Sequence, residues 1–103
     1  MSIEAARRAA QQLETMRLHG IACGLTADEV KEVSDAWTQW YRKLPIPIDY
    51  RFVMSRVTDR AMGEPWMPPS DDVTELACRL AAQSGMTILD AVRILQALIR
   101  PTN

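Results

Sequence analysis

Residues 70–100 read SDDVTELACRLAAQSGMTILDAVRILQALIR, and this stretch decides the fold class. Its first part places apolar residues at helical spacing, and its second part, from Ile88 onward, is apolar over most of its circumference. The residues between the parts, Ser84, Gly85 and Met86, are predicted to form the turn of an αα-hairpin. A helix that is apolar on so many sides must be buried on several of them. We therefore expect the last helix to be central to the domain or to lie in a dimer interface.

Upstream of this stretch, helical patterns and their stop signals predict three further helices. Ser2 is a good N-cap for the first, which Gly20 is expected to end. Thr26 opens a capping box, and Pro45 stops the helix that follows it. Asp49 caps the next one. The five predicted helices span residues 2–19, 26–44, 50–62, 70–84 and 87–100. With no repeat and no β-hairpin signal, the pattern predicts one all-α domain over residues 1–103, as a bundle or an orthogonal array.

Composition narrows the class of protein. The chain has 103 residues, a length typical of one domain. Its hydrophobic content of 48 % is too high for a disordered protein. The net charge of −1 provides no global basic field that would attract nucleic acid. No apolar run is long enough to span a membrane, and the first residues do not resemble a signal peptide, so we expect a cytoplasmic protein. Ten arginines against two lysines, with abundant alanine, are associated with bacterial or phage genomes.

The chain has few residues of the types that support catalysis or bind metal ions. The chain has one histidine, His19, and it lacks the glycine-rich and nucleophile motifs of common enzymes. The only soft metal ligands are His19, Cys23 and Cys78, whereas a structural zinc site needs four ligands. Each cysteine lies among apolar residues, so both are expected to be buried free thiols. We therefore predict no catalytic residue, no metal site, no cofactor and no enzymatic activity.

DNA binding is the alternative function. The segment 80–87 resembles the turn of phage-repressor-type helix-turn-helix proteins, which place a small residue before the turn and glycine within it. However, Ser84 stands where that motif buries an apolar side chain, and Ile88 and Leu89 begin the helix that would face polar base edges. The segment is also similar to the helix pair of ribbon-helix-helix antitoxins, but Trp-Met-Pro-Pro at 66–69 cannot supply their β-strand. We therefore interpret the segment as a core hairpin.

Aromatic residues around the proline-rich segments are the first candidates for a binding surface. Trp40 and Tyr41 are neighbours on one helix, and neighbours diverge by about 100°, so one of them is expected to be exposed or to lie at an interface. Trp66 and Met67 lie in a loop between prolines. Trp, Tyr and Met are enriched at interface anchors. The alternative, which we favour, is that Trp66 folds back as a plug on the core.

A basic segment is the second candidate. Arg56 and Arg60 share one helix face, where they could contact phosphate or an acidic protein. The alternative, which we favour, is a solvated face paired with the acidic residues between Asp28 and Asp35. The expected function is a non-enzymatic accessory or regulatory module that masks or bridges a protein partner. We expect a homodimer and no nucleic-acid partner. The candidate partner-binding residues are Trp40, Tyr41, Arg56, Arg60, Trp66 and Met67.

Overall fold

The structure, a computed structural model, describes residues 2–99 and contains five α-helices and no strand over that range. The all-α fold class predicted from the sequence is confirmed. By contacts the chain divides into two compact units, Met1–Pro68 and Pro69–Asn103, which are described separately below. The predicted end of the last helix at Arg100 lies outside the described residues. The helices are α1 (Ile3–Ala22), α2 (Ala27–Arg42), α3 (Tyr50–Ala61), α4 (Asp71–Ser84) and α5 (Ile88–Ile99).

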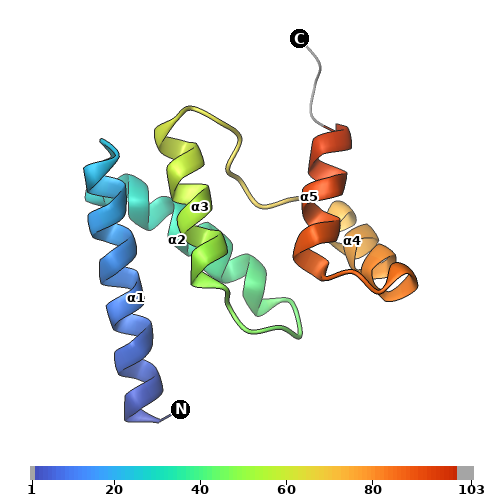
Figure 1. The fold of residues 1–103 in the computed structure, drawn as a ribbon, viewed down its shortest axis with the longest axis horizontal. Helices are drawn as coiled ribbons and strands as arrows, with labels where there is room; N and C mark the ends of the chain where they lie inside the picture. The colour runs from blue at the N-terminus through green and yellow to red at the C-terminus, as the bar shows by residue number, and fades with distance from the viewer. Residues whose placement is uncertain (1, 100–103) are drawn as a thin grey trace. The chain divides into compact units, whose positions relative to one another are not determined.

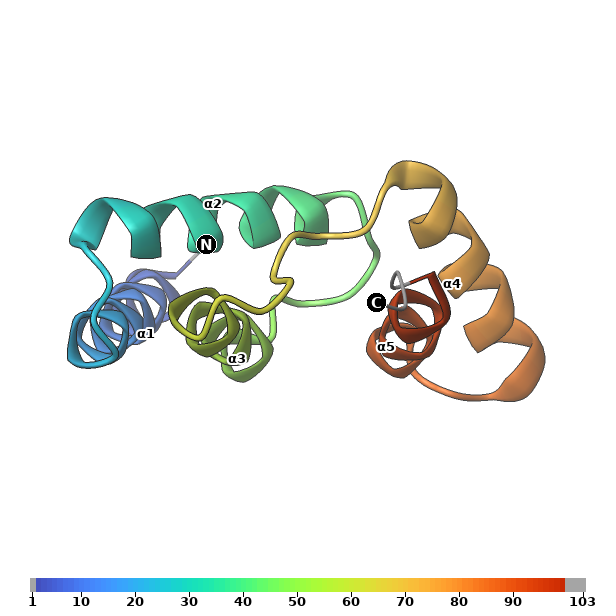
Figure 2. The same cartoon turned by 90° about the horizontal axis from the view of Figure 1, so that it is seen from above.

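The first unit is a three-helix unit in which α1, α2 and α3 all pack against one another. Seen from above, α2 runs lengthwise across α1 and α3, which are viewed nearly end-on (Figure 2). Apolar residues three and four apart on α2 form the stripe that enters the core, as the sequence predicts. The fully buried large side chains of this unit are Met16, Val33, Trp37, Tyr41, Val53 and Val57.

Gly20 allows the three helices to approach closely. The sequence predicts that Gly20 ends the first helix, and this is wrong: α1 continues to Ala22, and Gly20 is buried within it. A Cβ atom at Gly20 would overlap Val30 Cγ2 on α2 and would lie 3.1 Å from Val57 Cγ1 on α3. The glycine is therefore needed for helix packing.

The other helix starts follow their sequence signals. At the start of α2, the Thr26 hydroxyl accepts from the Glu29 backbone N–H at 3.1 Å, and the Glu29 carboxylate accepts from the Thr26 N–H at 3.0 Å. This reciprocal pair is the predicted capping box. At the start of α3, the Asp49 carboxylate accepts from the backbone N–H of Arg51 at 3.0 Å.

The second unit, the α4–α5 pair, is built from two helices joined by a short turn (Figure 1). Ser70 caps α4, and Gly85 ends it in the left-handed conformation with φ of 75°, as predicted. The Thr87 hydroxyl accepts from the Asp90 backbone N–H at 3.1 Å and so caps α5. In Figure 2, α4 is seen lengthwise and α5 end-on, so the two helices cross.

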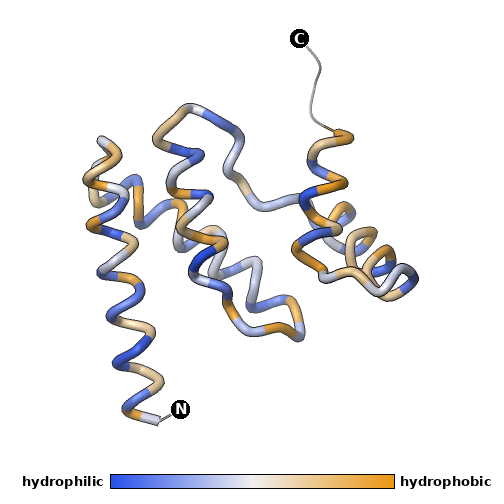
Figure 3. The backbone as a smooth tube through the Cα atoms, in the orientation of Figure 1, coloured by the Kyte–Doolittle hydropathy of each residue, from blue (hydrophilic) through white to orange (hydrophobic). Residues whose placement is uncertain are grey.

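The α4–α5 pair buries few side chains, and those are small. Two of the α5 residues are buried, Ala91 and Val92, although the helix is hydrophobic along most of its length (Figure 3). Within this unit α5 packs on α4, and the expectation that it is central to the domain stays a prediction. The other expectation, that it lies in a dimer interface, stays a prediction. The buried residues of the pair are Thr74, Ala77, Ala81, Ala91 and Val92.

Candidate functional site

The aromatic candidates on α2 lie inside the three-helix unit. The sequence predicts that either Trp40 or Tyr41 is exposed, and this is wrong, since both are buried. The reason is that α2 packs against α1 and also against α3, so more than one of its faces is covered. Their rings meet edge to face with centroids 5.0 Å apart, and Trp40 makes a similar contact with Trp37 at 5.1 Å. These rings fill the core and present no binding surface.

Trp66 returns from its loop to the same core. Its side chain is 9 % exposed, and its carbonyl oxygen accepts a hydrogen bond of 2.6 Å from Nε1–H of Trp37. The guanidinium carbon of Arg60 lies 5.2 Å from the centroid of the Trp66 ring, within cation–π distance. Trp66 therefore has the position that the plug interpretation predicts. Its neighbour Met67 is the exposed member of the loop pair, at 64 %.

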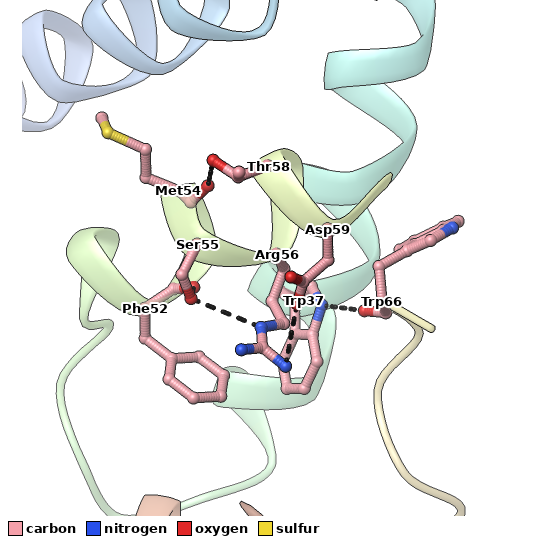
Figure 4. A network of polar contacts seen from close by, with 8 residues as sticks. All are labelled: Trp37, Phe52, Met54, Ser55, Arg56, Thr58, Asp59 and Trp66. Atoms are coloured by element: carbon pink, nitrogen blue, oxygen red, sulfur yellow. Dashed lines mark hydrogen bonds and ion pairs between the residues drawn. The ribbon is translucent and has the colours of Figure 1, made fainter. Parts of the chain in front are cut away.

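The Arg56 side chain contacts other side chains of its own helix, α3. Its Nη1 lies 3.2 Å from Oδ2 of Asp59, and its guanidinium carbon lies 4.8 Å from the centroid of the Phe52 ring. Its Nε donates to the hydroxyl of Ser55 at 3.4 Å. Figure 4 shows the side chain lying along α3 between these partners. An arginine held in this way has lost much of its freedom to reach a phosphate or an acidic partner.

Arg60 is paired with acidic residues of α2. Its Nη2 lies 3.6 Å from Oε2 of Glu29 and 3.5 Å from Oε2 of Glu32. Both carboxylates belong to the acidic stretch that the sequence names as the partner of the basic face. The hydrogen bond from the Thr26 backbone, and to a lesser extent the charge of Arg60, hold the pKa of Glu29 below its usual value. The charge of Arg60 is therefore compensated within the three-helix unit.

Neither cysteine is fully buried, and His19 lies near one of them. The sequence predicts two buried thiols, but Cys23 is exposed and Cys78 is half-buried. Cys23 is exposed because α1 extends to Ala22 and leaves it in the turn that follows. Nε2 of His19 lies 2.7 Å from the Thr58 hydroxyl and 3.7 Å from Sγ of Cys23. Within residues 2–99, no three His, Cys, Asp or Glu side chains are grouped closely enough to hold a metal ion.

A shallow hollow lies between α1 and α3. It encloses about 130 Å³ and is lined mainly by apolar atoms. Pockets for small ligands usually enclose at least ~300 Å³, so this hollow is too small to surround a substrate. Its lining residues are Gln12, Thr15, Tyr50, Arg51 and Met54.

The exposed aliphatic side chains of α5 are the feature that remains as a candidate site. Ile94 is 44 % exposed and Leu98 is 76 % exposed, and Ala97 between them is also exposed. Because residues three and four apart share a helix face, Ala97 and Leu98 lie on either side of Ile94, and we call these three residues the α5 stripe. The adjoining Ile99 is exposed as well. None of these residues is among the partner-binding candidates chosen from the sequence, although the apolar circumference of this helix was the signal that could have found them.

Comparison of the chain with protein-family models, with curated proteins and with solved structures finds no match. Over residues 2–99, no helix has both the length and the apolar content that crossing a bilayer requires. The interpretation of the site therefore depends on its geometry alone.

Proposed function

We propose that this chain is a small non-enzymatic protein-binding module, which masks or bridges a protein partner and docks through the α5 stripe. The observation that carries the proposal is the exposure of Ile94 and Leu98 on a helix whose buried residues are Ala91 and Val92. Aliphatic side chains that are exposed in line on one helix are typical of helix-mediated protein recognition. The proposal includes a cytoplasmic location, a bacterial or mobile-element origin and a homodimeric state.

Several features of the three-helix unit support placing the docking surface on α5. The aromatic candidates are enclosed in the core, and Arg56 and Arg60 are held by Asp59, Glu29 and Glu32. On α1, an ion pair between Glu14 and Arg17, whose atoms lie 2.6 Å apart, stands between the exposed Leu13 and the exposed Leu18 and Ile21. The α5 stripe has no ion pair within it among the described contacts.

Affinity capture with matched variants tests the proposal. The Leu98→Glu variant places a charge in the stripe, whereas Ala82→Glu places the same charge on an exposed position of α4. We expect the wild type and Ala82→Glu to capture the same proteins from the native host, and Leu98→Glu to lose them. Capture of the same proteins by all three would show that the α5 stripe is not the docking surface.

DNA binding stays the second candidate, because α4 and α5 cross and are joined through Gly85 in the left-handed conformation. This arrangement is shared by helix-turn-helix motifs. The exposed face of α5 argues against DNA binding, because it carries Ile94 and Leu98 where a recognition helix would present polar groups. A gel-shift assay at about 0.15 M salt decides the matter, since sequence-selective binding below micromolar exceeds ordinary non-specific binding.

A further inference from the structure

We propose that Cys23 is a modification site, whose thiol is activated by His19 and exchanges with small disulfides to form a mixed disulfide at the end of α1. The proposal does not rest on the proposed function, because both residues belong to the three-helix unit and the α5 stripe belongs to the α4–α5 pair. It is carried by the contacts of the His19 ring, by the exposure of Cys23 and by the open space beside it.

The Cys23 thiol lies next to an imidazole nitrogen. Nε2 of His19 is 3.7 Å from Sγ of Cys23, which is within hydrogen-bond distance for a sulfur atom. Cys23 is the C-cap of α1, and its backbone N–H donates to the carbonyl oxygens of His19 at 3.0 Å and of Gly20 at 3.1 Å. These bonds keep the sulfur one helical turn beyond the ring. A nucleophile and a base within hydrogen-bond reach of each other are the arrangement that activates a thiol.

The His19 ring is held by a residue of a different helix. Nε2 lies 2.7 Å from the hydroxyl oxygen of Thr58 on α3, and this hydroxyl donates to the carbonyl oxygen of Met54 at 3.3 Å (Figure 4). While the ring is neutral, the hydroxyl can donate to Nε2. Once Nε2 carries a proton, the hydroxyl oxygen accepts from it and the hydroxyl proton goes to Met54. Thr58 is therefore a positioning residue, which can hold the ring before and after it takes the thiol proton.

The end of α1 makes the thiol dependent on His19. The ring lies in the last turn of the helix, where the partial negative charge of the helix C-terminus stabilises a protonated imidazole. The same partial charge disfavours a thiolate at Cys23, and the thiolate is the reactive form of cysteine. The reactivity of Cys23 should therefore come from His19 and not from the helix.

The Cys23 thiol is open to a reagent. Cys23 is exposed, and so are its neighbours Ala22 and Gly24. A Cβ atom at Gly24 would meet no described atom within 4 Å, so the turn leaves open space next to the thiol. Cys78, by contrast, is half-buried on α4. The two thiols of the chain therefore differ, and the exposed one lies beside the histidine.

The reaction is a thiol–disulfide exchange. As Sγ of Cys23 attacks one sulfur of a small disulfide, the thiol proton passes to Nε2 of His19. A bond forms between Sγ and that sulfur, and the sulfur–sulfur bond of the small disulfide breaks. The leaving thiolate takes the proton from Nε2. One thiol and one disulfide thus give one mixed disulfide and one small thiol, and the small disulfide is the oxidant.

Rates of reaction with dithiodipyridine, an uncharged disulfide, test the proposal at neutral pH on the full chain carrying Cys78→Ser, in which Cys23 is the single thiol. The reference is the same chain unfolded in urea, where the thiol has no fixed neighbour. We expect Cys23 to react about tenfold faster or more in the folded chain, because a positioned base accelerates proton transfer. His19→Gln leaves Cys23 exposed and should remove this difference, with equal helix content by circular dichroism. A folded rate no higher than the unfolded rate, or an unchanged rate in folded His19→Gln, would overturn the proposal.

Two variants of Thr58 separate positioning of the ring from packing. Thr58→Val keeps the shape of the side chain and removes the hydroxyl, so we expect the rate of Cys23 to fall several-fold. Thr58→Ser keeps the hydroxyl and should keep the rate. Equal rates in the two variants would contradict the positioning role of Thr58.

Mass spectrometry of the wild-type chain after treatment with oxidised glutathione identifies the product. We expect one glutathione on the peptide that contains Cys23 before any on the peptide that contains Cys78, and we expect a reductant to remove it. First addition at Cys78, or a disulfide that links two chains through Cys23 in place of the adduct, would overturn the assignment of Cys23 as a site for small disulfides.

Discussion

In the three-helix unit the aromatic rings of α2 and of Phe52 on α3 are buried between helices, whereas in the α4–α5 pair the large side chains of Ile94 and Leu98 face solvent. Trp37, on α2, contacts Trp40 and also Phe52 of α3 edge to face. On α5, Leu98 is 76 % exposed. The difference follows from the number of helices, because three mutually packed helices can enclose a ring that two crossed helices cannot. Residue type alone therefore does not reveal a binding surface, since Trp37, Trp40 and Tyr41 are buried.

The largest expected effect on stability is that of Trp66→Ala, which removes the plug from the three-helix unit. We expect the free energy of unfolding to fall by about 3 kcal/mol, as for other buried large side chains. Trp66→Phe keeps much of the buried apolar area, so it should lower the free energy of unfolding by less. Leu98→Glu, compared in dilute solution, should change stability by less than ~0.5 kcal/mol, because its side chain is exposed. Denaturant unfolding measures all three, and equal losses for Trp66→Ala and Leu98→Glu would remove the contrast between the two units.

A smaller loss is expected from Gly20→Ala, which forces apart helices of the three-helix unit. The added methyl group meets Val30 and Val57, and we expect a cost of about 2 kcal/mol from overpacking. The control is Gly24→Ala, where the new methyl group meets no atom within 4 Å and the strain comes from the φ of 99° alone. That strain costs about 1 kcal/mol. If Gly24→Ala costs more than Gly20→Ala in thermal unfolding, close helix approach is not the reason for the glycine.

A still smaller loss is expected from Arg60→Gln, which removes the charge that Glu29 and Glu32 share. The ion pairs are partly exposed, so the free energy of unfolding should fall by less than about 1 kcal/mol. High salt should lower the free energy of unfolding of the wild type more than that of the variant. Capture of protein partners should be unaffected. Lost capture with an unchanged melting temperature would move the docking surface from α5 to the face of Arg60.

Local signals in the sequence predicted much of the fold. The capping box at Thr26, the Asp49 cap and the turn at Gly85 all lie where short-range hydrogen bonding and backbone conformation place them. The prediction for Gly20 is wrong because a glycine that ends a helix and a glycine that admits a neighbouring helix look alike in one sequence. The difference is set by Val30, which only the tertiary structure brings into contact.

The candidate site was less predictable, for a similar reason. The exposure of Trp40 and Tyr41 depends on how many helices pack against α2. The spacing of apolar residues within α2 does not predict that number. The pairing of Arg60 with the acidic stretch was anticipated from charge alone, as the preferred alternative to a basic binding face. The apolar circumference of α5 showed that something must cover it, but it did not show that α4 leaves Ile94 and Leu98 exposed.

Amide hydrogen exchange of the full chain, compared between concentrated and dilute solutions, tests the central claim most directly. The claim is that the α5 stripe is the surface that associates, whereas the aromatic residues stabilise the three-helix unit. We predict that concentrating the protein slows exchange in peptides covering residues 88–99 and leaves peptides covering residues 27–61 unchanged. Slower exchange in residues 27–61 with no change in residues 88–99, or no dependence on concentration in any peptide, would contradict the account.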